Sequence, residues 1–573
     1  MRRPVRWRRA AVVSVFALLG VGLVARAVYL QVLDHEFYRG EGDARHLRTV
    51  AIPASRGDLL DRDGRPLAVS TPIQTLWGVP GSLAEQPAAL REVAALLGID
   101  PERLVERVER DAERGRGFTY VKRHVPPAVA ERVMALRVAD LNVQREYRRY
   151  YPAGASMSHL VGFTDVDDHG REGLQLAYED WLAGAPGERR AVRDLTGREI
   201  RGMDVERDAV PGRDLRLSVD KRLQYLVSRR LADAMAEHRA ESGSIVAMDV
   251  RTGEVLAMAN APGYNPNDTA DRSGGRQRNR ALTDVFEPGS TMKPITIAAA
   301  LESGKFAPDD IIHTSPGHYT LGKYRISDAA DHGWLDLRGI VKKSSNVGVS
   351  KLARQLDPEQ MWSVFDAFGF GRPPGSEFPG EAPGYFNHPA LWHHVEQASI
   401  SYGYGISVSA LQLVRAYAAI ATGGVLPPVS FTALDATPEG RRIVSERTAL
   451  EVGRMLEGVV TDGTGHRAAV PGYRVAGKTG TSHRSQSGGY AEDRYVSVFA
   501  GFAPASDPRI AVVVVVTDPK AGEHFGSVVA APVFSDVMAD ALRLGGIEPD
   551  DIDPRLRADA PVVGSVPTGD DRS

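Results

Sequence analysis

The 573-residue chain contains no cysteine. This absence excludes disulfide bonds, thiolate zinc sites and cysteine nucleophiles, although it leaves the cellular compartment open. A strong charge of either sign is also missing, because the formal net charge is −3 and charged residues make up 25% of the chain. Such a balance gives no reason to expect a nucleic-acid-binding protein. The chain is too long for one hydrophobic core, so two or more domains are expected.

Acidic residues are absent from the N-terminus before Asp34, where five arginines within the first nine residues precede an apolar run from 10 to 25. Sixteen helical residues span about 24 Å at ~1.5 Å each, and continuing to residue 33 supplies the length of a ~30 Å hydrocarbon core. The pattern predicts a cytoplasmic basic tail at 1–9 and an uncleaved membrane anchor at 10–33. The alternative is a signal peptide cleaved near Ala27. Under either interpretation, the remainder of the chain is exported.

Residues 34–212 show short, mixed patterns. An Asp-Gly turn at 63–64 predicts a hairpin over 55–68, and the stretch 102–116, with acids and arginines on one side and apolar residues on the other, predicts a solvent-facing helix. His159 and His169 lie near several aspartates without a recognised metal-ligand spacing, so we interpret this segment as an ordinary loop. Pro211-Gly212 then marks a domain boundary.

From residue 213 onward the pattern is that of a compact domain. Two antiparallel hairpins are predicted at 244–259 and 495–517. The run 510–516 is apolar at every position, which predicts a strand buried on both faces. The helices available to cover those faces are predicted at 290–302, 347–356, 409–421 and 533–544. The acidic tail at 547–573 is predicted to be disordered.

A serine followed three residues later by a lysine, Ser290 and Lys293, opens the first of these helices. If the helix begins at Ser290, the two side chains share one face, and a nucleophile acquires a neighbouring base. Ser-x-x-Lys alone is weak evidence, since Ser218 and Lys221 also match it. That second pair follows an alternating run and is better interpreted as the end of a strand, with Asp220 capping the next helix.

Two further motifs distinguish Ser290 from Ser218. Ser344-Ser345-Asn346 interrupts two helical patterns, so a loop there can direct a hydroxyl and an amide into a cleft. Lys478-Thr479-Gly480-Thr481 ends a short apolar run and is interpreted as a strand edge passing into a glycine turn. The three motifs occur in this order along the chain.

This ordered set resembles the penicillin-recognising serine acyltransferases. Further segments resemble class B penicillin-binding proteins, and among these the division-specific FtsI type: the anchor, the Arg56-Gly57 hairpin, 148–152, 170–173, 403–406 and 501–504. The resemblance implies an α+β transpeptidase fold, with an antiparallel sheet covered by helices on both faces. It also implies a non-catalytic, dimerisation-like pedestal at 34–212 and a transpeptidase domain at 213–546.

The catalytic hypothesis assigns a role to each motif. Neutral Lys293 accepts the proton of Ser290, because burial and a second nearby cation both favour an uncharged lysine. Ser344 relays a proton to the leaving amine, and Lys478 keeps that network polarised. Asn346 hydrogen-bonds Lys293 or the substrate amide.

The third motif is expected to hold the substrate. Backbone N–H groups of Ser290 and Thr481 would form the oxyanion hole, a contribution of roughly 3–4 kcal/mol per donor in related acyl transfer. The hydroxyls of Thr479 and Thr481 would bind a carboxylate, and the strand edge at Gly480 would pair with an extended peptide.

The resemblance further implies a D,D-transpeptidase that acylates Ser290 with a peptidoglycan stem peptide ending in D-Ala-D-Ala and passes the acyl group to an amine. β-Lactams would acylate the same serine. An FtsW-type glycosyltransferase partner, a single-pass location in the cytoplasmic membrane at the septum and a periplasmic catalytic domain are implied, with no metal or organic cofactor.

Three alternatives share the motifs. A class A β-lactamase adds a Glu-x-x-Leu-Asn segment, which does not occur between 346 and 478. An inactive penicillin-binding protein or β-lactam sensor of the same fold lacks turnover. An elongation-specific transpeptidase differs in acting at the side wall instead of the septum.

Overall fold

The computed structural model describes residues 6–34, 47–193, 199–393, 395–486 and 489–551. Most of the predicted basic tail (1–5) and most of the predicted acidic tail (552–573) lie outside these ranges. The chain forms two compact units. Unit 1 comprises Met1–Gly57, Ser70–Arg148 and Ala183–Arg213, and unit 2 comprises Asp58–Val69, Arg149–Leu182 and Asp214–Ser573.

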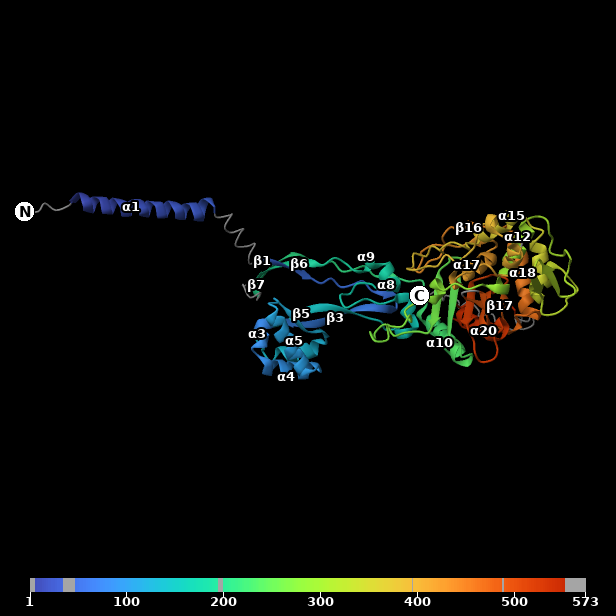
Figure 1. The fold of residues 1–573 in the computed structure, drawn as a ribbon, viewed down its shortest axis with the longest axis horizontal. Coiled ribbons are helices and arrows are strands. Elements are labelled where there is room, and N and C mark those ends of the chain that lie inside the picture. The colour runs from blue at the N-terminus through green and yellow to red at the C-terminus, as the bar shows by residue number, and fades with distance from the viewer. Residues whose placement is uncertain (1–5, 35–46, 194–198, 394, 487–488, 552–573) are drawn as a thin grey trace, which may run out of the picture. The chain divides into compact units, whose positions relative to one another are not determined.

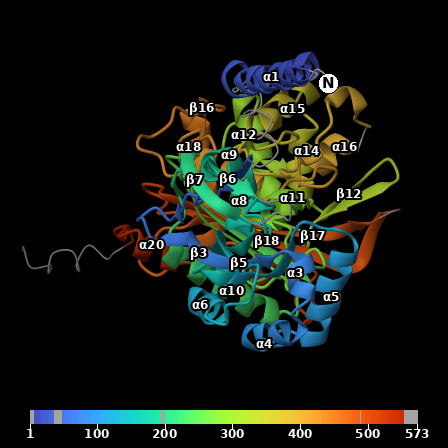
Figure 2. The same cartoon turned by 90° about the vertical axis from the view of Figure 1, so that its left-hand side faces the viewer.

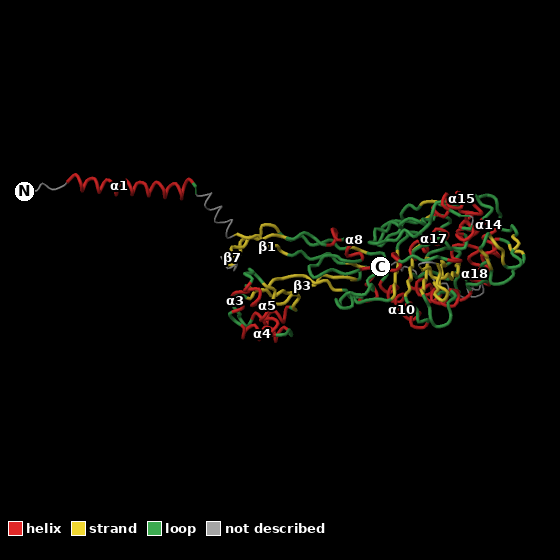
Figure 3. The backbone as a smooth tube through the Cα atoms, in the orientation of Figure 1, coloured by secondary structure: helices red, strands yellow, loops and turns green. Residues whose placement is uncertain are grey.

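Helix α1 (Arg6–Val28) continues into a π-helical turn, η1 (Tyr29–Leu33), and is drawn in Figure 3 as one uninterrupted helix. The 26 residues Trp7–Val32 form the one helix of the described chain that is long and apolar enough to cross a membrane. At ~1.5 Å per residue, this segment exceeds a ~30 Å hydrocarbon core. The predicted anchor at 10–33 coincides with this helix apart from its last residue.

The rest of unit 1 contains two packed regions. An antiparallel sheet is formed by β1 (Leu47–Ile52), β6 (Gly187–Arg193) and β7 (Glu199–Arg207). The second region has its own apolar core and contains most of β3 (Pro66–Gly78), α3 (Pro80–Ala84), α4 (Pro87–Leu97), α5 (Pro101–Glu113), β4 (Thr119–Val125), α6 (Pro127–Met134) and most of β5 (Leu141–Tyr150).

Helix α5 is the helix predicted at 102–116. The Asp100 side chain accepts hydrogen bonds from the backbone N–H groups of Glu102 and Arg103 and so caps its N-terminus. Leu104 and Val108 are buried in the core of unit 1, while the charged side chains between them face solvent. The sequence prediction is confirmed for this helix.

Unit 2 includes two segments from the region predicted as the pedestal, Asp58–Val69 and Arg149–Leu182. Strand β2 (Leu59–Leu60) pairs antiparallel with β3, which confirms the predicted hairpin, and parallel with β8 (Leu215–Arg216). Leu59, Leu160 and Leu174 are buried in the main core of this unit. The two compact units therefore do not divide at residue 212. The boundary predicted there remains a prediction about which part of the chain is the pedestal and which is the transpeptidase domain.

A five-stranded antiparallel sheet forms the centre of unit 2, in the order β10-β9-β19-β18-β17. Its strands are β9 (Ser242–Asp249), β10 (Val255–Ala261), β17 (Ala476–Gln486), β18 (Gly489–Ala503) and β19 (Ile510–Thr517). Both predicted hairpins are thus confirmed. Alternate residues of β19 enter two different apolar cores, Val513 and Val515 on one face and Val512 and Val514 on the other. The all-apolar run is therefore buried on both faces, as predicted.

Helices cover both faces of this sheet, which confirms the predicted fold class (Figure 1). Helices α12 (Lys293–Glu302) and α17 (Ala410–Ala421) contribute to one core, and α10 (Lys221–Glu237) and α20 (Ala531–Leu544) to the other. The remaining helices of unit 2 are α7 (Ser158–Val161), α8 (Gly173–Ala177), α9 (Glu179–Leu182), α11 (Arg280–Thr283), α13 (Leu337–Lys343), α14 (Asn346–Ala353), α15 (Pro358–Ala367), α16 (Glu396–Ile400), α18 (Glu446–Asp462) and α19 (Gly526–Val529).

Short two-stranded pieces complete unit 2. They are β11 (Ile312–His313) with β14 (Trp334–Leu335), β12 (His318–Leu321) with β13 (Tyr324–Ser327), and β15 (Val425–Leu426) with β16 (Arg441–Arg442). The β12–β13 hairpin projects from the body of the unit (Figure 2).

Candidate active site

Ser290 lies in a 3-10 turn, η3 (Gly289–Met292), and Lys293 is the first residue of α12. The helix predicted to start at Ser290 thus begins with a tighter turn. Side chains at i and i+3 eclipse in a 3-10 turn, so the lysine is carried directly over the serine. The Lys293 Nζ atom lies 2.5 Å from Ser290 Oγ, and the lysine side chain is fully buried. The predicted nucleophile and base are therefore brought together.

Gly289 permits the close approach of this turn to β17. Its φ is +54°, a conformation that favours glycine, and a Cβ atom there would lie 3.1 Å from the Thr481 carbonyl oxygen. Its N–H donates to the Gly403 carbonyl at 3.1 Å. The first and third motifs therefore meet through their backbones.

The second motif enters the same site from the junction of α13 and α14. Ser344 has a left-handed φ of +60° at the end of α13, which turns the chain sharply before Ser345 caps α14. The Lys293 Nζ atom lies 3.3 Å from Ser344 Oγ and 2.8 Å from Asn346 Oδ1. Both predicted side chains of this loop therefore contact the buried lysine.

Asp328, which follows β13, holds the loop in place and was not predicted from the sequence. Its carboxylate accepts hydrogen bonds from Ser345 Oγ and Asn346 N, both at 2.5 Å, and from Val347 N at 3.0 Å. No motif marks Asp328, because its partners lie 17 to 19 residues further along the chain.

Lys478 completes the cluster from strand β17. Its Nζ atom lies 3.0 Å from Ser344 Oγ and 3.1 Å from the Thr479 carbonyl oxygen, and its side chain is fully buried. The expected glycine turn is wrong, because β17 continues through Gly480 to Gln486, and its pairing with β18 shifts register only further on, between His483 and Ser485. Glycine is needed for a different reason: a Cβ atom at Gly480 would lie 2.7 Å from the Pro288 carbonyl oxygen. The strand is at the sheet edge, as predicted.

The threonines of the third motif have defined neighbours. Thr481 Oγ1 accepts a hydrogen bond from Gly526 N at 2.9 Å, so its hydroxyl proton remains available for a ligand. Thr479 Oγ1 lies 3.3 Å from Thr464 Oγ1, which follows α18 and was not predicted as part of the site. The oxyanion hole assigned to the N–H groups of Ser290 and Thr481 stays a prediction.

The comparisons with known proteins agree with this geometry. Residues 243–539 match the penicillin binding protein transpeptidase domain, and residues 51–217 match the penicillin-binding protein dimerisation domain. The chain is 40% identical, over 95% of its length and 93% of each relative, to the probable peptidoglycan D,D-transpeptidase PenA of Neisseria meningitidis and to the peptidoglycan D,D-transpeptidase FtsI of Escherichia coli K12. The chain belongs to the class B penicillin-binding proteins.

A solved structure of this family has the same fold. Penicillin-binding protein 3 of Mycobacterium tuberculosis, complexed with aztreonam, is 28% identical, has a TM-score of 0.68, and the match covers 87% of this chain and 98% of that one. The likeness therefore extends over nearly the whole of the solved chain.

Burial changes the acidity of both active-site lysines of this penicillin-binding protein. Burial lowers the pKa of Lys293 well below its ordinary value, and the neighbouring charge of Lys478 lowers it further, while Asp328 opposes the shift. Burial also lowers the pKa of Lys478, to about 7. A lowered pKa favours the neutral amine that the predicted role of Lys293 as general base for Ser290 requires.

The competing Ser218 pair does not form a site. Ser218 is fully buried, and its hydroxyl donates to the carbonyl oxygens of Val255 and Ser430. The Lys221 ammonium donates to the Pro66 carbonyl oxygen instead of contacting the serine. Asp220 caps α10, so the interpretation of this segment as a strand end and helix cap is confirmed.

Proposed function

We propose that this chain is a serine-type peptidoglycan D,D-transpeptidase that cross-links stem peptides during septal wall synthesis and is a target of β-lactams. The observation that carries the proposal is the 2.5 Å separation between Ser290 Oγ and the Nζ atom of buried Lys293. A serine hydroxyl becomes a competent nucleophile only when a base removes its proton, and a desolvated lysine is such a base. We assign residues 213–546 as the transpeptidase domain and 34–212 as the pedestal.

The acylation step uses the three motifs together. Neutral Lys293 takes the proton of Ser290, and Oγ attacks the carbonyl carbon of the penultimate D-Ala. The N–H groups of Ser290 and Thr481 hold the oxyanion of the tetrahedral intermediate. Ser344 delivers a proton to the nitrogen of the departing D-Ala and is reprotonated through the lysine pair, with Lys478 supplying the positive charge.

The second half-reaction restores the enzyme. An amine of a neighbouring stem peptide attacks the ester carbonyl, its proton passes to the lysine network, and Ser290 leaves as the alcohol. Asn346, held by Asp328, keeps Lys293 in position for both steps. A β-lactam follows the first half-reaction, because its strained amide presents a carbonyl to the same serine.

The substrate is held along β17. The hydroxyls of Thr479 and Thr481 bind the carboxylate of the terminal D-Ala. Because β17 is an edge strand, its free backbone groups pair with the extended peptide by strand addition. Gly480 keeps this edge close to the nucleophile turn.

The cellular role follows from the N-terminal helix and the similarity to a relative named FtsI. We infer a single-pass anchor at α1, a periplasmic catalytic unit, an FtsW-type glycosyltransferase partner and a septal location. The elongation-specific alternative predicts side-wall instead of midcell fluorescence of a tagged chain. That localisation decides between the two roles.

Labelling with a fluorescent penicillin tests the chemistry. Ser290→Ala is expected to abolish covalent labelling. Ser218→Ala, which removes the serine of the competing Ser218–Lys221 pair, is expected to retain it. The reverse result would overturn the assignment of Ser290. An acyl-enzyme that hydrolysed within seconds would instead identify a β-lactamase.

A further inference from the structure

A pocket of about 440 Å³ in unit 2 adjoins the candidate active site and shares Asn346 with it. Strand β13 and the segment 395–405 supply most of its lining, and three of the lining side chains are Tyr402, Tyr404 and Tyr490. We call it the tyrosine pocket, after these three residues. Because Asn346 Oδ1 also lies 2.8 Å from the Lys293 Nζ atom, the pocket begins beside the reacting groups.

The tyrosine pocket lies near the part of strand β17 that follows Thr481. The Tyr404 hydroxyl hydrogen-bonds to the backbone of His483 in this strand. Tyr490 is paired with Ser485 in the β17–β18 ladder, and the rings of Tyr404 and Tyr490 have centroids 5.7 Å apart. A peptide that follows β17 beyond Thr481 therefore approaches this pocket.

The distance along β17 selects one residue of the donor peptide. In the proposed function, Thr479 and Thr481 bind the carboxylate of the terminal D-Ala, and Ser290 attacks the residue before it. At ~3.3 Å per residue of extended chain, the next residue back lies ~7 Å from the terminal one. Two residues of β17, from Thr481 to His483, cover the same distance. The residue that precedes D-Ala-D-Ala is therefore the one that reaches the level of the pocket.

Strand β13 presents a backbone edge on the side of Asn346. Its partner is β12, and the Asp328 N–H, just after β13, donates to the Gly317 carbonyl at 2.8 Å. In an antiparallel pair, alternate residues direct their backbone groups toward the partner strand and away from it. Arg325 and Ser327 therefore direct theirs away from β12, where the Ser327 carbonyl accepts a hydrogen bond from Asn346 Nδ2 at 3.0 Å. The edge of β13 that includes Arg325 is thus the edge next to the second motif.

Arg325 is, among the described residues, the one charged residue that lines the tyrosine pocket. In the part of the chain that the structure describes, its guanidinium group has neither a hydrogen bond nor an ion pair, and its side chain is exposed. A guanidinium group offers two parallel N–H donors together with a positive charge, which match a carboxylate. The chemistry of the pocket therefore suits a ligand that ends in a carboxylate.

Two carboxylates contact residues of the pocket wall without lining the pocket themselves. Asp328 is engaged by the loop of the second motif. Glu287 Oε1 accepts hydrogen bonds from Gly405 N at 2.8 Å and from Tyr490 Oη at 3.0 Å, and its Oε2 atom is buried. Both carboxylates hold parts of the wall in place, and in the described chain neither is ion-paired with Arg325.

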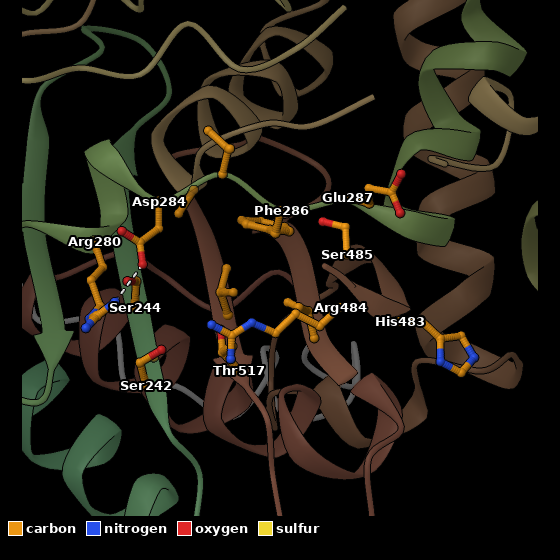
Figure 4. Close-up of a pocket in the computed structure, with 15 residues that line it drawn as sticks. Ser242, Ser244, Arg280, Asp284, Phe286, Glu287, His483, Arg484, Ser485 and Thr517 are labelled. Carbon is orange, nitrogen blue, oxygen red and sulfur yellow. Dashed lines mark hydrogen bonds and ion pairs between the residues drawn. The ribbon is translucent and has the colours of Figure 1, made fainter. Parts of the chain in front are cut away.

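A smaller pocket of unit 2, of about 130 Å³, differs in this respect. Figure 4 shows its Arg280 ion-paired with Asp284, and its Arg484 pairs with Glu241. The protein itself therefore supplies the anions for the arginines of that pocket, whereas Arg325 is left for a ligand.

We propose that the tyrosine pocket binds the side chain of the stem-peptide residue that precedes D-Ala-D-Ala, and that Arg325 selects a side chain ending in a carboxylate. The aliphatic part of this side chain packs against the rings of Tyr402 and Tyr404, whose centroids lie 5.7 Å apart, and the guanidinium group binds its carboxylate. The inference rests on the proposed transpeptidase function and adds a feature of the donor that the three motifs do not contact.

Two penicillins test the charge preference on the purified full chain in detergent micelles. Both have the penicillin nucleus acylated with adipic acid, whose far end is a free carboxylate in one and a primary amide in the other. This acyl group takes the place of the residue before D-Ala-D-Ala. We expect the carboxylate to acylate Ser290 about fivefold faster, measured by competition with a fluorescent penicillin, and the preference to decrease with added sodium chloride. Equal rates, or faster acylation by the amide, overturn the role of Arg325.

Variants of the β12–β13 hairpin locate the preference. Arg325→Gln is expected to remove it and Arg325→Glu to reverse it. Lys323→Gln removes a second cation of the same hairpin that does not line the pocket, and it is expected to keep the preference. Both residues are exposed, so neither change removes a buried contact. An equal loss of preference in Lys323→Gln and Arg325→Gln would show that only the overall charge of the hairpin matters and would overturn the site.

A pair of peptides tests the assignment to the stem peptide. Both end in D-Ala-D-Ala, preceded by α-aminopimelic acid in one and by its side-chain amide in the other. We expect the carboxylate peptide to slow fluorescent labelling of Ser290 at about fivefold lower concentration than the amide, and Arg325→Gln to abolish this difference. Equal protection by the two peptides, or none by either, overturns the assignment. The Ser290→Ala labelling result does not depend on the pocket and decides the proposed function separately.

Discussion

Lys293 and Lys478 share one hydroxyl, since their Nζ atoms lie 3.3 and 3.0 Å from Ser344 Oγ. Two charged ammonium groups buried at one hydroxyl would repel each other in a medium of low dielectric. The arrangement therefore favours a single protonated lysine near neutral pH. Burial and the Lys478 charge both lower the pKa of Lys293, and the proposed mechanism accordingly assigns the remaining proton to Lys478.

Lys293→Ala tests this division of roles. The variant is expected to keep its fold, because a buried amine that is costly to charge is removed, but to acylate more slowly by about 10²- to 10⁴-fold, the usual contribution of a general base. Penicillin acylation kinetics and thermal unfolding measure the two effects. Lys221→Ala, which changes the lysine of the competing Ser218–Lys221 pair, serves as the matched control. Near-normal acylation by Lys293→Ala would exclude Lys293 as the essential base.

Lys478→Met tests the energetic cost of the second lysine. A folded pKa of about 7, against 10.5 in the unfolded chain, corresponds to roughly 5 kcal/mol of lost stability when the lysine is charged. Because the folded pKa is the lower one, this loss is complete below pH 7, shrinks as pH rises from 7 toward 10.5, and is absent above that range. Methionine avoids the loss and keeps the volume.

We therefore expect Lys478→Met to raise the unfolding temperature at pH 7 and to abolish penicillin acylation. The stability gain should decrease as the pH is raised toward 10, which thermal scans at a series of pH values will measure. A gain that is independent of pH would show that the charge of Lys478 is not its cause. Lys351→Met, at a lysine that is not buried, is the control and should show little pH-dependent gain.

Asp328 is expected to act as a positioning residue. Asp328→Ala removes the acceptor for Ser345 Oγ and for two backbone N–H groups, so the Ser344–Asn346 loop loses its fixed position. We expect acylation to fall by about tenfold or more, with a loss of roughly 1–3 kcal/mol in stability from the unsatisfied groups. Acylation kinetics and thermal unfolding measure both.

Asp331→Ala provides the matched comparison, because Asp331 lies three residues further on and accepts from Ser315 Oγ and Gly333 N away from the motif. It is expected to lower stability without slowing acylation. Equal effects of the two variants on acylation would show that Asp328 has no special relation to the site.

The convergence of the three motifs was predicted from their order and spacing along the chain, which resemble those of the penicillin-recognising serine acyltransferases. The sequence could not predict Asp328 or Thr464, whose contacts join segments that are distant along the chain and carry no motif. The wrong glycine turn at Gly480 has a similar cause. Local pattern associates glycine with turns, whereas here the missing side chain accommodates the Pro288 carbonyl of another segment.

The same limit applies to the division into units. Patterns along the chain predicted the helix α5 and the hairpins, since their contacts are local. The inclusion of Asp58–Val69 and Arg149–Leu182 in unit 2 depends on long-range packing, in which Leu59 pairs with Leu215. Residue patterns along the chain do not show which distant segments pack together.

Gly480→Ala tests whether the close approach of β17 to the nucleophile turn is needed for acylation. The new Cβ atom would lie 2.7 Å from the Pro288 carbonyl oxygen and 2.9 Å from Thr291 Cγ2, so the strand and the turn must separate. We expect a loss of about 1–3 kcal/mol in stability and a fall in acylation of tenfold or more, because a small misplacement of the oxyanion donors reduces their effect.

Gly458→Ala, in the interior of α18, adds the same methyl group where no atom lies within 4 Å. It should gain roughly 0.5–1 kcal/mol from helix propensity and acylate normally. Unchanged acylation in Gly480→Ala would mean that the site tolerates a wider separation of these two segments than their contacts indicate.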